Sequence, residues 1–450
     1  MVQNTTKRRR WLAAVSVVLV CLVVAIAVAA SLVANLFPSD ALLDEEWQRF
    51  TAIAIFVGSY LALAIGRVPG LSIDRAGIAL VGAGLMIASG ALPLEAAYTA
   101  IDGNTIALLL GVMIVVANLR LSGFFPVANA WLIERARRPI ILLCAVAATS
   151  AFFSAFLVND AVCLVLAPLI LELTITMRRN PVPYLLTVAM ASNVGSTATI
   201  TGNPQNIMIG SFSQIPYANF VLMLGPIALI GLVVTVALVV LMHRDEFADE
   251  TPLKMPKAHI RFNLVLVLRA LLATAIMIAL FFAGVTPAKV AIVIGGLLLL
   301  TRRLKSRRIY EEIDWSLLMM FAGLFIIVAG AERALLTPEF FTAVGRLHLD
   351  YIPVLSAVTA VLSNLVSNVP AVLVLKPFVG SLKDQNTAWL VIAMASTLAG
   401  NFTVLGSIAN LIVVQRAAAG GVRISFWDYF RVGAPLTIIT LVIGTLWLWP

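Results

Sequence analysis

Uncharged, apolar stretches long enough to cross a bilayer recur from one end of this chain to the other. A membrane-spanning helix needs about 20 such residues, and inside the hydrocarbon every backbone polar group must be paired within helices or closed barrels. Of the 450 residues, 61% are hydrophobic and 12% are charged, and the mean hydropathy is +1.02. These runs predict an all-α polytopic membrane protein.

Several other classes of function find no support in the sequence. The net charge of +9 is typical of basic cytoplasmic loops in a membrane chain, so no nucleic acid partner is expected. The three cysteines lie in apolar spans, and the three histidines show no metal-ligand spacing. Walker A, HExxH and GxSxG motifs are missing from the sequence. We therefore expect a protein that is not an enzyme and holds no resident cofactor.

The charges that flank the spans predict how the chain is oriented. Arg8 to Arg10 place the N-terminus inside, and the following 27-residue uncharged run, 11–37, is too long for a signal-peptide core, so it predicts a retained span. The same rule places the C-terminus outside. We expect an integral protein of the plasma (inner) membrane with a cytoplasmic N-terminus.

A polar linker divides the chain into two halves. The expected organisation is an N-terminal span and outer loop at 1–47, a first repeat at 48–242, a cytoplasmic linker at 243–262 and a second repeat at 263–450. Each repeat is expected to contain a hairpin that turns back within the membrane and a broken helix. The hairpins are placed at 139–177 and 351–382, and the broken helices at 181–212 and 387–413.

The two halves contain related, interrupted segments. Residues 189–206 (AMASNVGSTATITGNPQN) align without a gap on residues 393–410 (AMASTLAGNFTVLGSIAN), with seven of eighteen positions identical. Just upstream, 154–168 matches 363–377. The flanking charges place the two hairpins on opposite faces of the membrane, which predicts inverted-topology repeats. Paired, interrupted apolar segments of this kind indicate the binding site of a transporter.

The second hairpin is too short to cross the bilayer twice. Its expected break at Asn368-Val369-Pro370 leaves twelve residues for the returning limb, which rise about 18 Å against a hydrocarbon core of about 30 Å. Its tip is therefore expected near the midplane, where irregular backbone must line a cavity or be buried in protein.

Four irregular segments are expected to converge: the tips at 158–160 and 367–369 and the breaks at 202–204 and 406–407. Broken helices expose N–H groups suited to anions and C=O groups suited to Na⁺. Asp160 is the strongest single candidate for a functional residue. A carboxylate inside the membrane costs free energy, so its presence there indicates a functional role. Its repeat counterpart is Val369, so the tips differ chemically. Lys376 either helps to hold an anion or extends to the interface.

These motifs resemble the ion transporter superfamily, in the branch of arsenite permeases and sodium/proton antiporters with citrate-transporter-like domains. The resemblance is carried by VNDA at 158–161, SNVGSTATITGNPQN at 192–206, SNVPAVLVLKP at 367–377 and GNFTVLGSIANLIV at 400–413. It spans residues 48–450 and implies about eleven transmembrane helices, two re-entrant hairpins, a homodimer and an elevator motion.

The resemblance also implies roles for individual residues. It places cation coupling at Ser154, Asn159, Gly202, Ser363, Asn368 and Gly406, with Na⁺ at Ser154, Asn159 and Gly202, and solute binding at the hairpin tips. The intramembrane carboxylate adds Asp160 to the cation-coupling set. With the polar groups of the breaks, the expected solute-binding residues are Asn159, Asp160, Thr199, Asn203, Pro204, Ser367, Asn368, Thr403 and Ser407. In the dicarboxylate branch both tips read Ser-Asn-Thr. Here they read Val-Asn-Asp and Ser-Asn-Val, which favours the arsenite-permease side.

The leading functional hypothesis is a permease for a small anion or oxyanion such as arsenite or antimonite, coupled to H⁺ or Na⁺. A Na⁺/H⁺ antiporter is the nearest alternative, and a Na⁺-coupled di- or tricarboxylate symporter is the third. The expected partners are a small-ion or small-anion substrate, the lipid bilayer and a second copy of the chain. The sequence leaves open whether a soluble ATPase subunit docks on the linker.

Overall fold

The computed structural model describes residues 41–65, 73–133, 138–248, 262–301, 303–335 and 345–449. All regular secondary structure in these ranges is helical. Eight of the described helices are long and apolar enough to cross a membrane, so the chain is an all-helical, integral membrane protein, as the sequence predicts. The predicted span at 11–37 and most of the linker at 243–262 lie outside the described residues.

The chain divides into two compact units. The helices of unit 1 are α2 (Ala41–Ile65), α3 (Arg75–Ala88), α4 (Leu94–Ala100), α16 (Trp315–Leu335) and α19 (Asn368–Val379). In the first half of the chain, unit 2 contains α5 (Gly103–Ser122), α6 (Phe124–Ile133), α7 (Pro139–Phe156), α8 (Asn159–Thr176), α9 (Pro181–Ser196), α10 (Pro204–Ser213), α11 (Tyr217–Met242) and α12 (Arg244–Ala248).

The second half of the chain supplies the remaining helices of unit 2. They are α13 (Leu264–Phe282), α14 (Pro287–Leu299), α15 (Ser306–Glu311), α18 (Ile352–Val366), α20 (Gln385–Ala399), the short 3₁₀ helix η1 (Val404–Gly406), α21 (Ile408–Ala419) and α22 (Phe426–Leu448).

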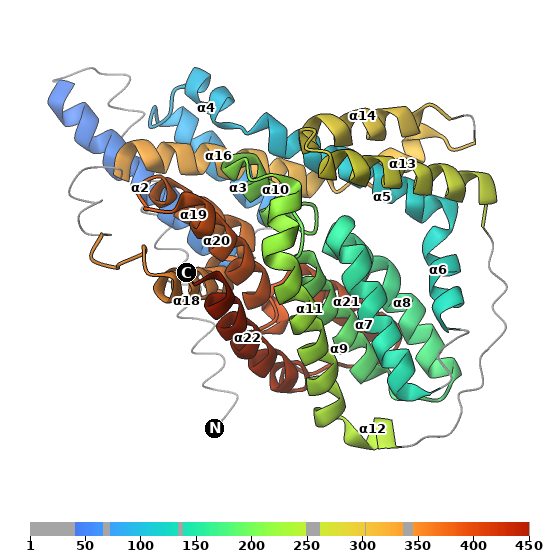
Figure 1. Ribbon diagram of the computed structural model, residues 1–450. Coiled ribbons are helices and arrows are strands. Elements are labelled where there is room, and N and C mark those ends of the chain that lie inside the picture. The colour runs from blue at the N-terminus through green and yellow to red at the C-terminus, as the bar shows by residue number, and fades with distance from the viewer. Residues whose placement is uncertain are drawn as a thin grey trace. The chain divides into compact units, whose positions relative to one another are not determined.

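Unit 1 is built around three closely packed helices. Figure 1 shows α16 lying along α3, and α2 also packs against both. Glycines permit the close approach: a Cβ at Gly323 would lie 2.6 Å from the backbone carbon of Ala79, and one at Gly82 would lie 2.4 Å from Ser59 Oγ. Small residues at such contacts are typical of helices that associate in membranes, where backbone proximity replaces the hydrophobic effect as a driving force.

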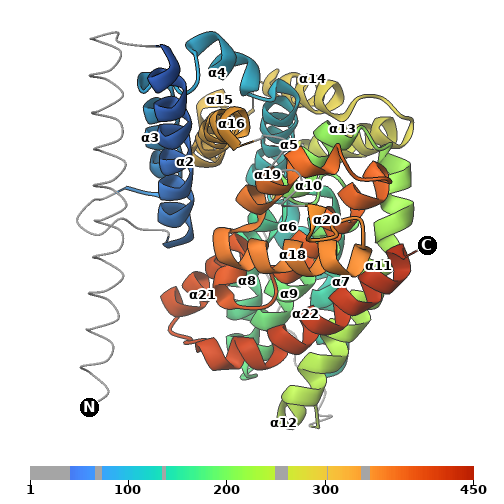
Figure 2. The same ribbon diagram turned by 90° about the vertical axis from the view of Figure 1, so that its left-hand side faces the viewer.

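Unit 2 has α9 at its centre. All side chains of α9 from Pro183 to Ser196 are buried, and the helix packs against α7, α8, α11 and α21. Figure 2 shows α8, α9 and α21 next to one another. The corresponding helix of the other half, α20, is likewise buried from Ala388 to Ala399 and packs against α22 and α10. The two related segments therefore form the interior of this unit.

The helix starts follow from local sequence chemistry. Asn180, Asn203 and Ser407 each accept a hydrogen bond from a backbone N–H of the first turn that follows them, which satisfies donors that a helix start leaves unpaired. Proline is the first helical residue of α7, α9, α10 and α14, where its missing N–H costs nothing.

The second hairpin turns earlier than the sequence predicts. Its returning helix, α19, begins at Asn368 rather than after Pro370, because proline is tolerated in the first turn of a helix. The break itself is Ser367, whose φ of 79° is in the left-handed region. The limbs have 15 and 12 residues and rise about 22 and 18 Å, so neither is long enough to cross the bilayer.

The first hairpin differs in length. Both α7 and α8 have 18 residues and rise about 27 Å, close to the thickness of the hydrocarbon core. The break between them is Leu157–Val158, so Asn159 and Asp160 occupy the first turn of α8. The helices of the predicted second hairpin are therefore too short to cross the bilayer, whereas those of the first are close to the length that crossing needs.

Candidate functional site

Two helix breaks face each other in the interior of unit 2. Helix α9 ends at Ser196 and α10 begins at Pro204; α20 ends at Ala399, and α21 begins at Ile408 after η1. Each break is longer than the two or three residues expected from the sequence, because several turns precede the next helix. The first segment is almost wholly buried, and the second is buried except at Phe402, Thr403 and the exposed Leu405. The buried polar groups of both segments must therefore be paired within the protein.

An asparagine closes each break in the same way. Asn206 Nδ2 donates to the carbonyl oxygens of Ser196 and Thr199, at 3.1 and 3.0 Å. Asn410 Nδ2 donates to the carbonyl oxygens of Gly400 and Thr403, at 2.7 and 3.1 Å. The acceptors occupy corresponding positions of the aligned segments. The identical asparagines of the two repeats therefore have one structural role, which is to bind carbonyl oxygens that the broken helices expose.

The glycines of the breaks also correspond. A Cβ at Gly202 would lie 2.2 Å from the carbonyl oxygen of Ser196, and one at Gly406 would lie 2.7 Å from the carbonyl oxygen of Gly400. Ser196 and Gly400 are again aligned positions. Because no side chain fits there, each glycine is needed for the backbone to fold back on itself.

The two breaks are joined by reciprocal side-chain hydrogen bonds. From the first repeat, Asn193 donates to Asn410 Oδ1 at 2.9 Å and accepts from Ser407 Oγ at 3.1 Å. From the second repeat, Thr397 Oγ1 contacts Asn206 Oδ1 at 3.4 Å and accepts from Asn203 Nδ2 at 3.1 Å. Asn193 and Thr397 are aligned with each other, as are Asn203 with Ser407 and Asn206 with Asn410. Side chains of each repeat therefore form hydrogen bonds to the helix break of the other repeat.

The tip of the first hairpin is attached to this network. Asn159 Nδ2 donates to Asn193 Oδ1 at 3.0 Å, and the Asn159 backbone N–H donates to the Gly202 carbonyl at 2.9 Å. Ser154 Oγ lies 2.6 Å from Ser192 Oγ, and Thr199 Oγ1 bonds the Ala155 carbonyl. The structure thus brings together the predicted site residues Ser154, Asn159, Thr199 and Gly202.

One polar atom at the tip accepts no hydrogen bond from the described residues. Asn159 is 4% exposed, and its Oδ1 is buried without a donor. An amide oxygen of this kind is a suitable ligand for a hard cation. Asp160, the next residue, is half-buried in the first turn of α8, where the partial positive charge of the helix start favours a carboxylate.

Other predicted solute ligands already bind within the protein. Asn203 Oδ1 accepts from the Asn206 backbone N–H, and its Nδ2 donates to Ser196 and Thr397. Ser407 Oγ caps α21 and donates to Asn193. Thr403 contributes its carbonyl to Asn410, and Pro204 is the first residue of α10. Their side chains and backbones shape the breaks.

The second hairpin is divided between the units. Ser363 Oγ donates to the Ser396 carbonyl at 3.0 Å inside unit 2, and Gly406 lies in the same unit. Ser367 and Asn368 belong to unit 1, where both are half-buried. Lys376, on the returning helix, lies 3.7 Å from Glu332 of α16, so its ammonium group has a carboxylate partner within unit 1.

Sequence reasoning missed Asn193, Thr397 and Asn401. Asn401 donates to the Met190 carbonyl at 3.3 Å and accepts from Asn193 at 2.9 Å. The three residues differ from their aligned counterparts, so a search for identical positions passes over them. The signal that could have found them is polarity: each repeat keeps a hydrogen-bonding side chain at position 193 or 397 inside an apolar run.

Known transporters are similar to this chain in sequence and in fold. The chain is 29% identical over 427 residues to the uncharacterized transporter Rv2684 of Mycobacterium tuberculosis, covering 88% of this chain and 97% of that protein. It is 28% identical over 464 residues to the silicon efflux transporter LSI3 of Oryza sativa subsp. japonica, covering 87% and 96%. The crystal structure of the Alcanivorax borkumensis YdaH transporter superposes with a TM-score of 0.52 at 14% identity, covering 89% and 97%.

The family is shown by a match that covers most of the chain. The model of the citrate transporter family, CitMHS, matches residues 60–399, a range that includes both hairpins and the first break and ends with α20, just before the second break. The chain is therefore a transporter of the CitMHS citrate transporter family, with the fold of the YdaH transporter.

Proposed function

We propose that this protein is a secondary active permease that moves a small anion or oxyanion such as arsenite or antimonite, coupled to H⁺ or Na⁺. The observation that carries the proposal is the buried tip of the first hairpin. Two neighbouring residues, Asn159 and Asp160, begin helix α8 at this tip. Asn159 Oδ1 accepts no hydrogen bond from the described residues, and Asn159 Nδ2 donates to Asn193, which connects the tip to the two helix breaks.

Coupling is assigned to this tip because its atoms suit a small cation. Asn159 Oδ1, the Gly202 carbonyl and Ser154 Oγ are neutral oxygen ligands that come from three elements. Asp160 adds the only carboxylate of the two tips and can carry a proton or balance the charge of Na⁺. By the repeat relation, Ser363, Asn368 and Gly406 form the second cation site.

The solute is assigned to the remaining polar groups around the breaks and tips: Asn159, Asp160, Thr199, Asn203, Pro204, Ser367, Asn368, Thr403 and Ser407. These are mostly uncharged hydrogen-bonding groups, which fit a small hydroxylated solute better than a multiply charged carboxylate. The name of LSI3, a silicon efflux transporter, agrees with a solute of this type, since dissolved silicon and arsenite are both small hydroxides.

The reciprocal bonds between the breaks support inverted repeats, because a two-fold relation makes each repeat contact the other in the same way. On this basis we propose about eleven transmembrane helices with two re-entrant hairpins, an elevator motion, a homodimer and an inner-membrane location with the N-terminus inside. A soluble ATPase docking on the linker would add a further partner.

A Na⁺/H⁺ antiporter is the second candidate, and the position of Asp160 beside Asn159 supports it. A carboxylate that binds either H⁺ or Na⁺ is sufficient for exchange without any solute. A Na⁺-coupled di- or tricarboxylate symporter is the third candidate. It has less support, because the described residues at the tip of hairpin 1 offer no arginine or lysine.

The decisive experiment uses purified protein in proteoliposomes with a pH-sensitive dye inside. With H⁺ as the coupling ion, we expect a pulse of arsenite to move protons; with Na⁺ as the coupling ion, we expect arsenite uptake to require Na⁺. In both cases a pulse of Na⁺ without arsenite should move no protons. Asp160→Asn should reduce coupled flux at least about tenfold, since a neutral amide neither ionises nor binds a proton. Glu172→Gln, an exposed position on the same helix, should keep wild-type flux.

Two outcomes would contradict the permease. Proton movement driven by Na⁺ alone would assign the antiporter instead. Full arsenite-coupled flux in Asp160→Asn would remove the coupling role of this carboxylate. Citrate in place of arsenite tests the third candidate in the same vesicles.

A further inference from the structure

The first turn of α19, the returning helix of the second hairpin, is attached to α2. The hydroxyl of Tyr60 donates to the carbonyl oxygen of Pro370 at 3.3 Å. Tyr60 is 5% exposed, and its ring lies against that of Phe56, with 4.4 Å between the ring centroids. Because burial and ring packing restrict the side chain, its hydroxyl holds Pro370 at a fixed place on α2.

This hydrogen bond is formed well inside the membrane-spanning part of α2. The spanning segment runs from Glu46 to Ile65. Along a segment of about 30 Å, Tyr60 lies about 21 Å from Glu46. At this depth neither water nor lipid offers the hydroxyl or the carbonyl another partner, so the bond is costly to break.

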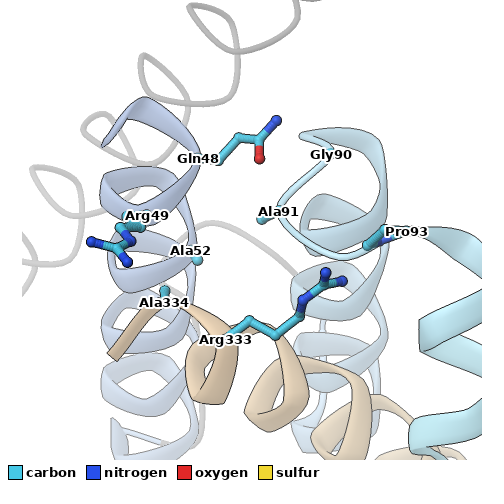
Figure 3. A pocket seen from close by; sticks show the side chains of 8 residues that line it. All are labelled: Gln48, Arg49, Ala52, Gly90, Ala91, Pro93, Arg333 and Ala334. Atoms are coloured by element: carbon cyan, nitrogen blue, oxygen red, sulfur yellow. The ribbon is translucent and has the colours of Figure 1, made fainter. Parts of the chain in front are cut away.

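A charged pair attaches the last turn of the same helix to α16. Lys376 Nζ lies 3.7 Å from Glu332 Oε1, and the two side chains are 38% and 26% exposed. The next residue of α16, Arg333, extends in another direction, toward the space between α2 and the Gly90–Pro93 segment (Figure 3). Helix α19, which also packs against α16, is therefore attached to unit 1 in both its first and its last turn.

The residue that precedes α19 has a strained backbone. Ser367 has a φ of 79° and a ψ of 160°, a combination that only glycine adopts readily. The aligned residue of the first hairpin, Val158, has a φ of −24°, so the positive φ belongs to the second hairpin alone. Strain of this kind persists only where the surrounding structure enforces it, and the two attachments of α19 provide such a restraint.

The Ser367 side chain does not have the role that its position suggests. A serine just before a helix usually accepts a hydrogen bond from a backbone N–H of the first turn. Asn203 and Ser407 do so at the starts of α10 and α21, whereas Ser367 makes no such bond to α19. Ser367 is half-buried. Its hydroxyl is therefore not used to stabilise the helix start.

We propose that Tyr60, Glu332 and Lys376 are positioning residues for the tip of the second hairpin. They hold α19 on α2 and α16, and this attachment keeps Ser367 in the conformation in which its hydroxyl serves the solute or the coupling ion instead of α19. The inference rests on the binding role proposed above for Ser367 and Asn368. The three positioning residues act through the tip and need not contact a ligand themselves.

The attachment to α2 is tested by hydrogen–deuterium exchange of the purified full-length protein, which requires no solute. Tyr60→Phe removes only the hydroxyl, and we expect the amides in the first turn of α19 to exchange about fivefold faster. Tyr98→Phe is the control, because Tyr98 is 67% exposed on α4, and it should not change this exchange. Ser367→Gly removes the backbone strain, so in that background Tyr60→Phe should have a much smaller effect.

The attachment to α16 is tested with charge variants in the same measurement. Glu332→Gln and Lys376→Gln should each speed exchange in the last turn of α19. The double variant Glu332→Lys/Lys376→Glu reverses the pair and should restore slow exchange. Arg307→Gln is the control: it breaks an ion pair with Glu311 whose side chains are 90% and 62% exposed, and pairs of this kind contribute little.

Transport kinetics separate positioning from simple stabilisation. In proteoliposomes, Tyr60→Phe should raise the KM for arsenite about fivefold, since the tip loses one restraint on its geometry. The maximal rate per folded protein should stay close to that of the wild type. A tyrosine with a merely structural role would lower the amount of folded protein and leave the KM unchanged.

Each outcome decides the proposal. Unchanged exchange in Tyr60→Phe and in both charge variants would overturn the attachment, and faster exchange with a wild-type KM would overturn the positioning role. A wild-type KM in Ser367→Ala would instead contradict the binding role on which this inference rests. Absence of arsenite transport by the wild type would remove the function proposed above, and the exchange measurements would still decide whether the attachment holds α19.

Discussion

At the scale of single residues, Asn193 uses all the hydrogen-bonding capacity of its side chain. Its Nδ2 donates to Asn401 Oδ1 and Asn410 Oδ1, both at 2.9 Å, and its Oδ1 accepts from Asn159 and Ser407. An amide offers two donors and two acceptor positions, so the side chain is saturated. It connects the tip of the first hairpin with the break of the second repeat.

Asn193→Ala should therefore destabilise the protein by about 2–4 kcal/mol, because it leaves several buried partners unpaired. The measurement is the thermal unfolding midpoint in detergent. The matched control is Asn118→Ala: Asn118 is also buried but donates only to the Ile114 carbonyl of its own helix. Equal midpoints for the two variants would show that the network contributes no stability of its own.

At the scale of secondary structure elements, the packing of α9 against α7 depends on Gly195. A Cβ at this position would lie 2.3 Å from both Cα and the carbonyl oxygen of Ala151. Such contacts involve backbone, which cannot move away as a flexible side chain can. The two helices must therefore separate to admit even a methyl group, and the hairpin tip would move with α7.

We expect Gly195→Ala to lower both the unfolding midpoint and the transport rate, with a loss of stability of about 1–3 kcal/mol from overpacking. Gly225→Ala in α11 is the control, since its Cβ would meet only Val221 Cγ1 at 3.8 Å. That substitution should be neutral or slightly stabilising, because alanine has the higher helix propensity. A neutral Gly195→Ala would contradict the close packing.

The elements also show what the sequence could and could not predict. Apolar length predicted the helical, multi-span fold, and the aligned repeats placed both breaks near Gly202 and Gly406. The ends of the helices were not predictable in the same way. Helix α9 stops at Ser196, six residues before Gly202, because hydrogen bonds of Asn203 and Asn206 stabilise the turns that follow it. Such long-range bonds cannot be predicted from the pattern of apolar residues.

The candidate site was only partly accessible from the sequence for the same reason. The identical residues of the repeats, such as Asn206 and Asn410, proved to close the breaks, and this role follows from their backbone partners. The residues that join one repeat to the other differ between the copies, as Asn193 and Thr397 do. Hydrogen bonds between unlike residues that are far apart in the sequence can be identified only in the three-dimensional structure.

At the scale of the whole molecule, charge distribution predicts the orientation in the membrane. The segment around Arg307 is rich in basic residues, whereas acidic and basic residues are mixed around Lys383. The positive-inside rule therefore predicts that the first segment lies in the cytoplasm and the second outside.

Single cysteines in a cysteine-free background test this orientation. In intact cells an impermeant thiol reagent should label Lys383→Cys, and it should label Arg307→Cys only after the membrane is permeabilised. Both positions are exposed, so access is limited by sidedness alone. Labelling in the reverse order would invert the proposed topology, and equal labelling in intact cells would point to a mixed population.

The reciprocal bonding of the two breaks has a consequence for biosynthesis. The partners of Asn193 are synthesised much later than Asn193 itself: Asn401 follows it by 208 residues and Asn410 by 217 residues. At about 5–20 residues per second, the ribosome needs roughly 10–40 s to supply them. During that interval the first half of the chain is in the membrane with its interior amides unmatched. The insertion machinery must shelter a half-built protein until translation is nearly complete, and a stalled ribosome would leave an intermediate suited to degradation.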